Sequence, residues 1–122
     1  MIKKAQTTIY VTDVDSALKF YSDTLGMHVK SHWGKDFAEL EMNGINIGLH
    51  PATQKGPMPG TKGAISIGLE VEDLDAEVAR LRDRGVVFQG NVVEDGPVRL
   101  AFFADPDGNP VYLSQVKRGI WG

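Results

Sequence analysis

The hydrophobic and polar positions of this 122-residue chain change from a strand pattern to a helix pattern near its start. Residues 5–12 are rich in β-branched and aromatic types and predict a strand, with Gln6 and Tyr10 on the same face. Apolar residues then recur at the spacing of one helix face. They are Val14, Leu18, Tyr21 and Leu25. The start of the chain therefore predicts a strand followed by an amphipathic helix.

The residues at both ends of this predicted helix suit its boundaries. Asp13 is a favourable N-cap, because its carboxylate can accept hydrogen bonds from the first free N–H groups. Gly26 suits the left-handed position that follows a helix. Three further strands are expected at residues 27–31, 37–42 and 45–50, the last two joined by an Asn43-Gly44 hairpin turn.

The same order of elements returns later in the chain. Asp13-Val14-Asp15 is matched 60 positions on by Asp73-Leu74-Asp75, and the Leu25-Gly26 helix end is matched by Arg84-Gly85. The second copy is expected to hold strands at residues 64–71, 86–89, 98–103 and 111–116, and a helix at 74–84. Each copy is thus a βαβββ unit, and an internal repeat of this kind predicts two modules of one fold.

The predicted fold class is α+β: two tandem βαβββ modules that form a curved, partly open eight-stranded barrel with the helices outside. We expect one domain over residues 1–122, with module one at 1–50, a Pro/Gly-rich hinge at 51–63 and module two at 64–122. A ligand site is expected in a cleft between the modules. The hinge leaves open whether the modules pair within one chain or exchange between chains.

Composition and charge exclude several functions. The formal net charge is −3 and no basic run stands out, so nucleic acid is not an expected partner. Cysteine is absent, which excludes disulfides and thiol catalysis. No apolar run reaches the ~20 residues that cross a bilayer, so we expect no membrane partner and a cytoplasmic protein. Residues 105–109, Asp-Pro-Asp-Gly-Asn, are expected to be a tight turn rather than a metal loop.

Three stretches of the chain resemble the vicinal oxygen chelate superfamily, which includes glyoxalases, extradiol dioxygenases and fosfomycin- and bleomycin-resistance proteins. They are residues 11–21 with Leu25-Gly26-Met27, residues 71–75, and residues 102–109. The resemblance spans nearly the whole chain and is specific for the fold. It is a weak guide to activity, because this scaffold carries very different chemistries.

The resemblance also implies where a divalent metal would bind. Metal-dependent members place a ligand on the first, fourth, fifth and last strands, and these positions fall on Gln6, Gly48, Ser66 and Tyr112. An amide, two hydroxyls and a missing side chain form a poor ligand set at neutral pH. We therefore expect no metal and no cofactor.

A displaced metal site is left open. His50 lies two positions beyond Gly48, so alternation places both on one face, and Glu70 shares a face with Ser66. These two side chains could hold a weaker ion, although a lone histidine near a strand end is more often a hydrogen-bonding residue. We favour His50 as a polar contact to a bound molecule.

Aromatic residues give the remaining signal. Tyr10, Trp33, Phe37, Phe102 and Tyr112 lie on segments expected to line the cleft, and Trp33 is expected in a polar turn where a core role is difficult. Large flat side chains at a cavity suit planar or amphipathic ligands. Trp121 belongs to the same group of aromatic residues, with packing of the tail on a neighbouring subunit as the alternative.

The sequence thus predicts a metal-free protein that binds a small aromatic or amphipathic molecule, similar to the bleomycin-resistance branch, and a homodimer, as is common in the families it resembles. The expected ligand-binding residues are Gln6, Tyr10, Trp33, Phe37, His50, Ser66, Glu70, Phe102 and Tyr112. Two alternatives stay open. One is a lyase, isomerase or dioxygenase with a metal near His50 and Glu70, and the other is a metal-free enzyme that uses Tyr112 or His50 as acid or base.

Overall fold

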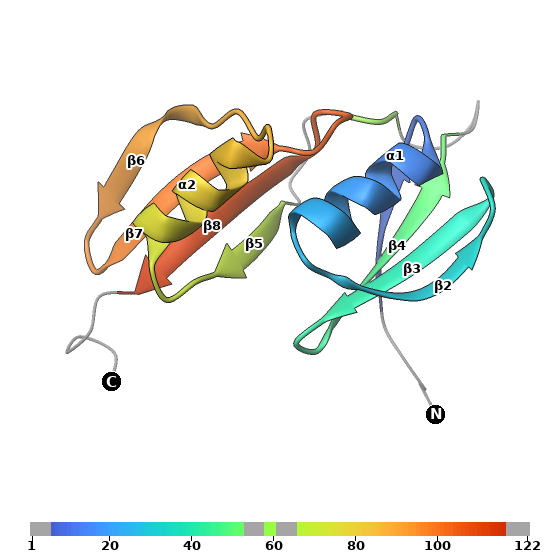
Figure 1. Cartoon of the computed structure of the whole chain (residues 1–122), viewed down its shortest axis with the longest axis horizontal. Coiled ribbons are helices and arrows are strands. Elements are labelled where there is room, and N and C mark those ends of the chain that lie inside the picture. The colour runs from blue at the N-terminus through green and yellow to red at the C-terminus, as the bar shows by residue number, and fades with distance from the viewer. Residues whose placement is uncertain (1–5, 53–57, 61–65, 117–122) are drawn as a thin grey trace. The chain divides into compact units, whose positions relative to one another are not determined.

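A computed structural model describes residues 6–52, 58–60 and 66–116 of the chain. Backbone contacts divide the chain into two compact units. Each unit contains one four-stranded sheet and one helical segment, which confirms the α+β class and the two tandem βαβββ modules (Figure 1). Module one contains β1 (Thr7–Val11), α1 (Val14–Lys19) with the π-helical turn η1 (Phe20–Thr24), β2 (His28–Trp33), β3 (Phe37–Met42) and β4 (Ile45–Pro51). Module two contains β5 (Ile67–Glu70), α2 (Leu74–Asp83), β6 (Gln89–Asp95), β7 (Val98–Ala104) and β8 (Pro110–Val116).

The two sheets have the same topology. The strand order is β1-β4-β3-β2 in module one and β5-β8-β7-β6 in module two. In each module the first strand runs parallel to the last, while the other neighbours are antiparallel. The repeat that is visible in the sequence is therefore a repeat of strand pairing as well as of strand order.

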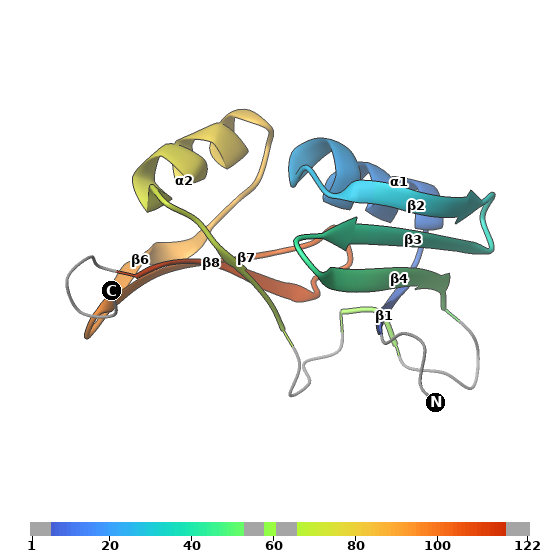
Figure 2. The same ribbon diagram turned by 90° about the horizontal axis from the view of Figure 1, so that it is seen from below.

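Each module packs its helix on one face of its sheet, as Figure 2 shows most clearly for α2. The apolar residues of the helix and of the sheet face that it covers are almost fully buried. In module one they are Val11, Val14, Ala17, Tyr21, Ala38, Leu40, Ile47 and Leu49. In module two they are Leu74, Val78, Leu81, Ala101, Phe103, Val111 and Leu113. Burial of this apolar area is the main term that stabilises each module, and the opposite sheet face carries no helix of that module.

The predicted helix starts are confirmed. The Asp13 carboxylate accepts hydrogen bonds from the backbone N–H groups of Asp15 at 2.9 Å and Ser16 at 3.4 Å. Asp73 accepts one from the N–H of Ala76 at 3.1 Å. These bonds satisfy donors that have no partner within the helix.

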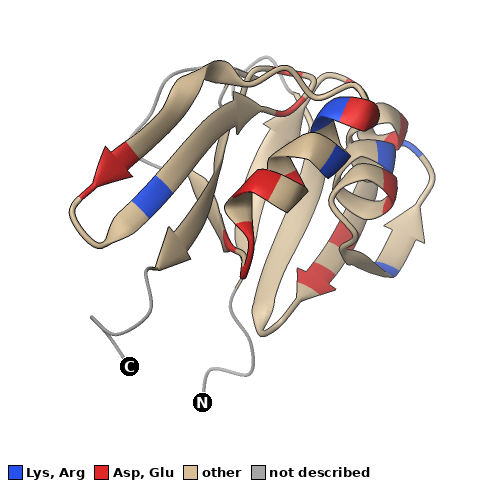
Figure 3. Ribbon diagram, turned by 60° about the vertical axis from the view of Figure 1, so that its left-hand side comes forward, with Lys and Arg blue, Asp and Glu red and all other residues tan. Residues whose placement is uncertain are grey.

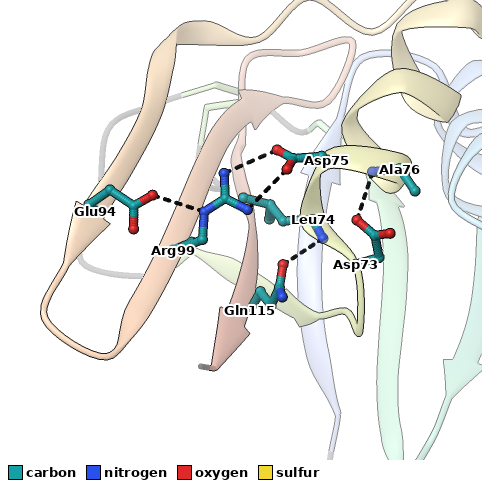
Figure 4. A network of polar contacts seen from close by, with 7 residues as sticks. All are labelled: Asp73, Leu74, Asp75, Ala76, Glu94, Arg99 and Gln115. Atoms are coloured by element: carbon teal, nitrogen blue, oxygen red, sulfur yellow. Dashed lines mark hydrogen bonds and ion pairs between the residues drawn. The ribbon is translucent and has the colours of Figure 1, made fainter. Parts of the chain in front are cut away.

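Both helices carry acidic residues in the first turn and basic residues in the last, and Figure 3 shows both signs there rather than one basic face. In module two, Arg99 on β7 joins the start of α2 to β6 (Figure 4). Its guanidinium donates to both Asp75 carboxylate oxygens, at 3.1 and 3.2 Å, and to Glu94 at 3.0 Å. The hydrogen bonds that Arg99 donates to Asp75, and then the one to Glu94, raise the pKa of Arg99. Beside this group, Gln115 on β8 accepts a hydrogen bond from the N–H of Leu74 at 2.8 Å.

The two helices end differently. After α2, the N–H of Val86 donates to the carbonyl of Leu81, and the N–H of Gly85 donates to that of Arg82, both at 3.0 Å. This pair of bonds is a Schellman motif, with Gly85 at φ 94°.

The helix of module one ends with two corresponding hydrogen bonds, and each spans one residue more than its counterpart after α2. The N–H of Met27 donates to Tyr21 at 3.0 Å, and that of Gly26 donates to Ser22 at 2.9 Å. The cap aspartate lies 13 positions before the glycine in module one, at Asp13 and Gly26, and 12 in module two. The π-helical turn η1 therefore accommodates one extra residue, as π-bulges commonly do.

Alignment of the two copies places the extra residue between Asp23 and Gly26, and matching Leu25 with Arg84 leaves Thr24 unmatched. Tyr21 and Asp23 match Leu81 and Asp83 at an offset of 60, whereas the glycines match at an offset of 59.

We predict that deletion of Thr24 converts η1 into a regular helical turn and leaves module one folded, with a change in the free energy of unfolding of about 1 kcal/mol or less. Deletion of Asp83 is the matched control, because α2 has no surplus residue and Gly85 would be rotated by about 100°. The control should lose about 2 kcal/mol or more. Denaturant unfolding followed by circular dichroism measures both, and equal losses would contradict the insertion account.

Several element boundaries differ from those predicted. Strand β6 begins at Gln89, so the strand expected at residues 86–89 is wrong. Val86 is buried as the residue that follows the glycine of the α2 cap. Phe88 packs against Phe103, with ring centroids 5.2 Å apart. Val86 thus packs at the end of α2 and Phe88 packs in the core, and neither residue belongs to a strand.

In module one, β2 extends to Trp33, so the expected polar turn around this residue is also wrong; Trp33 pairs with Phe37 across the β2–β3 hairpin. On α1, Ala17 is fully buried while Leu18 is only partly buried, because the face toward the sheet follows Val14, Ala17 and Tyr21.

The turn at residues 105–109 is confirmed. The N–H of Asn109 donates to the carboxylate of Asp105 at 2.8 Å, and the N–H of Asp105 donates to the carbonyl of Asn109 at 2.9 Å. Residues 106–108 are part of the first compact unit, where the Asp107 carboxylate accepts hydrogen bonds from the backbone N–H and the hydroxyl of Thr12. Both aspartates of this turn thus accept hydrogen bonds from protein groups, Asp105 from within the turn and Asp107 from Thr12.

Some predicted features lie outside the described residues: the first residues of the strand expected at 64–71, most of the hinge, and Trp121. Within the described part of the chain, no helix has the length and apolar character needed to cross a membrane.

Candidate functional site

Module one has a sheet face that its own helix does not cover. Strand alternation and cross-strand register place Gly48 and His50 of β4 on this face, together with Phe37 of β3 and Tyr10 of β1. We call it the open face of module one. Five of the expected ligand-binding residues lie on the segments that form it. They are Gln6, Tyr10, Trp33, Phe37 and His50.

Four rings, one from each strand, form a row across this open face. Trp33 and Phe37 are cross-strand partners, with ring centroids 6.3 Å apart. His50 and Tyr10 are likewise partners, 5.4 Å apart. Continuing the β3–β4 register by one residue places Phe37 opposite His50 and joins the two pairs. We call Trp33, Phe37, His50 and Tyr10 the aromatic row.

Access to the aromatic row is uneven. Trp33 is 70% exposed in module one, whereas Phe37, His50 and Tyr10 are partly buried. The Nδ1 atom of His50 lies 2.8 Å from the carbonyl oxygen of Pro51, so this nitrogen carries the proton when the bond forms. In the neutral form of the ring, the other nitrogen, Nε2, then has a lone pair for an acceptor or ligand role.

The next row of the open face contains Gly48, which has no side chain. A methyl group at Gly48 would lie 3.1 Å from the Gln6 amide nitrogen and 3.2 Å from the Phe37 ring. The amide and the ring therefore cover the backbone at Gly48, which is buried. Glu39 of β3 is the cross-strand partner of Gly48 and is 7% exposed.

Glu39 was missed by the sequence reasoning. Its position is visible in the pattern, because Phe37 and Glu39 are two residues apart on a predicted strand and must share a face. An acidic residue on a strand ordinarily faces solvent, so the burial of Glu39 opposite Gly48 is seen only in the structure.

Module two has a corresponding open face, on which the other four expected residues lie. They are Ser66, Glu70, Phe102 and Tyr112. Tyr112 pairs with both Gly68 and Phe102, and its ring is 6.1 Å from that of Phe102. A methyl group at Gly68 would lie 2.3 Å from Cζ and Oη of Tyr112, so the phenol occupies the space over this glycine.

The residues at the four metal-ligand positions of the family do not fit a divalent cation. Gly48 has no side chain, and the space above it is taken by an amide nitrogen and a phenyl ring. The Tyr112 phenol lies against Gly68, and Ser66 supplies only a hydroxyl. Among residues 6–52, 58–60 and 66–116, no three His, Asp or Glu side chains are grouped so as to hold a metal ion. The chemistry of these donors suits hydrogen bonds and ring contacts to an organic molecule.

Comparisons with known proteins agree with this fold. Residues 3–113 match the sequence model of the Glyoxalase/Bleomycin resistance protein/Dioxygenase superfamily. The chain therefore belongs to this superfamily, and the resemblance noted from its motifs is confirmed.

Individual relatives differ in what they do. The chain is 32% identical to a probable lactoylglutathione lyase of Synechocystis sp., over 89% of this chain and 92% of that protein. It is also similar to the crystal structure of TnmS3, an antibiotic binding protein from Streptomyces sp., with a TM-score of 0.73, 29% identity, and coverage of 95% of this chain and 98% of that one. A lactoylglutathione lyase from Agrobacterium tumefaciens shares the fold, with a TM-score of 0.74, 19% identity, and coverage of 98% and 96%.

We predict that Gly68→Ala destabilises the protein by about 1 kcal/mol or more, because the added methyl must displace the Tyr112 ring. An alanine in an open strand position would instead stabilise by roughly 0.5–1 kcal/mol. The same substitution in a Tyr112→Ser background should therefore be neutral or stabilising. Denaturant unfolding of the four proteins in this cycle measures the coupling, and an equal effect of Gly68→Ala in both backgrounds would show that the phenol does not lie over the glycine.

Proposed function

We propose that this protein binds a flat, aromatic organic molecule without a metal ion, and that the aromatic row of module one is the main contact surface. The observation that carries the proposal is the arrangement of Trp33, Phe37, His50 and Tyr10, one ring from each of the four strands, on the face opposite the helix. Side chains of this kind offer a large contact area and lose little conformational freedom on binding.

Two further observations support binding of an organic molecule rather than metal-dependent catalysis. The family's ligand positions carry groups that suit hydrogen bonds to an organic guest rather than coordination of a cation. TnmS3, which is described as an antibiotic binding protein, is 29% identical to this chain over nearly its full length. Gln6 and His50 would hold polar groups of the ligand beside the rings, and Ser66, Glu70, Phe102 and Tyr112 are proposed as further contacts from module two.

The planar tricyclic compound acridine is a suitable probe of the aromatic row. We predict measurable binding by fluorescence titration of the probe at pH 7.5, and a loss of roughly three- to tenfold in affinity for Trp33→Ala, because one stacking partner is removed. Val29→Ala is the matched control, since Val29 is an exposed apolar residue of the same strand whose partner, Leu40, faces the helix. Equal affinities of the two variants would contradict a role for the row, and no binding to the wild type would contradict the proposed function itself.

A second candidate function is a metal-dependent lyase, favoured by the 32% identity with a probable lactoylglutathione lyase. It would need His50 and Glu70 as metal ligands. With Nδ1 of His50 bonded to Pro51, the ring could coordinate only through Nε2.

We expect no rise in melting temperature when Mn²⁺, Co²⁺, Ni²⁺ or Zn²⁺ is added, because an ion that does not bind the native state cannot stabilise it. A rise with one of these ions that His50→Ala removes, together with lactoylglutathione lyase activity lost in the same variant, would establish the enzyme instead.

Assembly and location stay predictions. We propose a homodimer because such dimers are common in the families this chain resembles, and sedimentation equilibrium tests it directly. The expected location is the cytoplasm.

A further inference from the structure

His50 is a polar member of the aromatic row. Its ring lies on β4, in register with Phe37 of β3 and Tyr10 of β1, and its Nδ1 atom is 2.8 Å from the carbonyl oxygen of Pro51. A carbonyl oxygen can only accept a hydrogen bond, so Nδ1 donates and carries the proton of the neutral ring. The other nitrogen, Nε2, is then an acceptor and not a donor.

Within the part of the chain that the structure describes, no group donates a hydrogen bond to this nitrogen. The contacts of His50 there are the bond from Nδ1 to Pro51 and the ring contact with Tyr10, whose centroid is 5.4 Å away. The imidazole is partly buried beside other rings. An acceptor in such surroundings gains more from a hydrogen bond than one in open water, because the local dielectric constant is lower.

We propose that the aromatic row prefers flat ligands that carry a hydrogen-bond donor at the ring edge, as phenols do, and that Nε2 of His50 accepts this bond. This inference rests on the proposed function and names the class of ligand that the row prefers. It assigns His50 as a specificity-determining residue, in addition to the area of contact that its ring provides.

The other rings of the row do not distinguish donor from acceptor ligands in this way. Phe37 has no polar side-chain atom, and the indole of Trp33 can only donate. The Tyr10 hydroxyl can both donate and accept, so it suits either kind of ligand. His50 is therefore the member of the row whose remaining nitrogen accepts without donating.

The preference follows from the cost of leaving an acceptor without a partner. A flat ligand that covers the imidazole excludes water from Nε2. If the ligand has no donor, the acceptor loses its hydrogen bond, and this loss costs more free energy than an ordinary hydrogen bond contributes. A phenolic hydroxyl replaces the excluded water. A site that forms such a bond discriminates against analogues that lack the donor.

Three flat bicyclic probes, all neutral at pH 7.5, test the inference. They are 2-naphthol, which has a donor; 2-methoxynaphthalene, in which a methyl group replaces the donated hydrogen; and quinoline, whose ring nitrogen only accepts. The wild-type protein should bind 2-naphthol about fivefold more tightly than 2-methoxynaphthalene, as expected for one hydrogen bond. Quinoline should also bind more weakly than 2-naphthol. Isothermal titration calorimetry measures all three affinities.

The variant His50→Phe keeps a flat ring in the row and removes the acceptor. We expect its affinity for 2-naphthol to fall to about that for 2-methoxynaphthalene, while the affinity for 2-methoxynaphthalene changes by less than about twofold. His28→Phe is the matched control, because His28 is exposed on β2 and pairs with Glu41 rather than with a member of the aromatic row. The control should leave the ratio of the two affinities unchanged.

The tautomer of His50 can be measured without a variant. In a long-range ¹H–¹⁵N NMR spectrum of the free protein, we expect the proton of the neutral ring on Nδ1, and we expect the Nε2 signal to shift when 2-naphthol is added. A proton on Nε2 would overturn the selectivity, as would tighter binding of quinoline than of 2-naphthol.

The outcomes separate the two proposals. If the wild type binds 2-naphthol and 2-methoxynaphthalene equally, if His50→Phe weakens both equally, or if acridine binds and 2-naphthol does not, the selectivity is overturned while the binding function stands. If neither acridine nor any of the three probes binds, the proposed function fails as well. The wild-type affinities and the NMR spectrum decide the question even if His50→Phe does not fold.

Discussion

Each module has one helix for two sheet faces, and this constraint determines the rest of the structure. An amphipathic helix buries its apolar stripe on one face of a four-stranded sheet and leaves the other face to be used for something else. The Asp cap at Asp13 or Asp73, the apolar residues that follow, and the terminating glycine fix the length of the helix that covers each sheet. The residues that alternate with the core residues along the same strands then form the open face.

The two open faces have diverged although the strand pairing has not. In module one the four strands contribute Trp33, Phe37, His50 and Tyr10 to one row. The equivalent row of module two pairs Val93 with Leu100, Leu100 with Ser114, and Ser114 with Glu70. Both modules also contain a glycine covered by side chains, which are Gln6 and Phe37 at Gly48 and Tyr112 at Gly68. Aromatic rings and the Gln6 amide thus occupy the space over both glycines.

Much of the fold could be predicted from the sequence because its signals are local. Asp caps, glycine terminators and the Asn-Gly hairpin act within a few residues, and the internal repeat doubled the caps and the terminators. The failures have non-local causes. Trp33 was expected in a turn because its neighbours are polar, yet pairing with Phe37 extends β2 to include it. The segment at Val86–Phe88 has the composition of a strand, but its apolar residues pack at the end of α2 and against Phe103.

The candidate site was predictable in part for the same reason. Residue types and alternation identified the aromatic residues and the unsuitable metal-ligand positions. The row itself required the register between β2, β3 and β4, which single-strand patterns do not contain. The burial of Glu39 was hidden because an acidic residue on a strand ordinarily faces solvent.

The central claim is that the open face of module one holds a flat organic guest rather than a metal ion. Backbone ¹⁵N NMR of the labelled protein, titrated first with acridine and then with Mn²⁺, tests it most directly. The account predicts that acridine shifts the Trp33 indole signal and the amides of Phe37, Gly48 and His50, while low concentrations of Mn²⁺ leave these signals sharp. Selective paramagnetic broadening of the same signals by Mn²⁺, with no response to acridine, would contradict it.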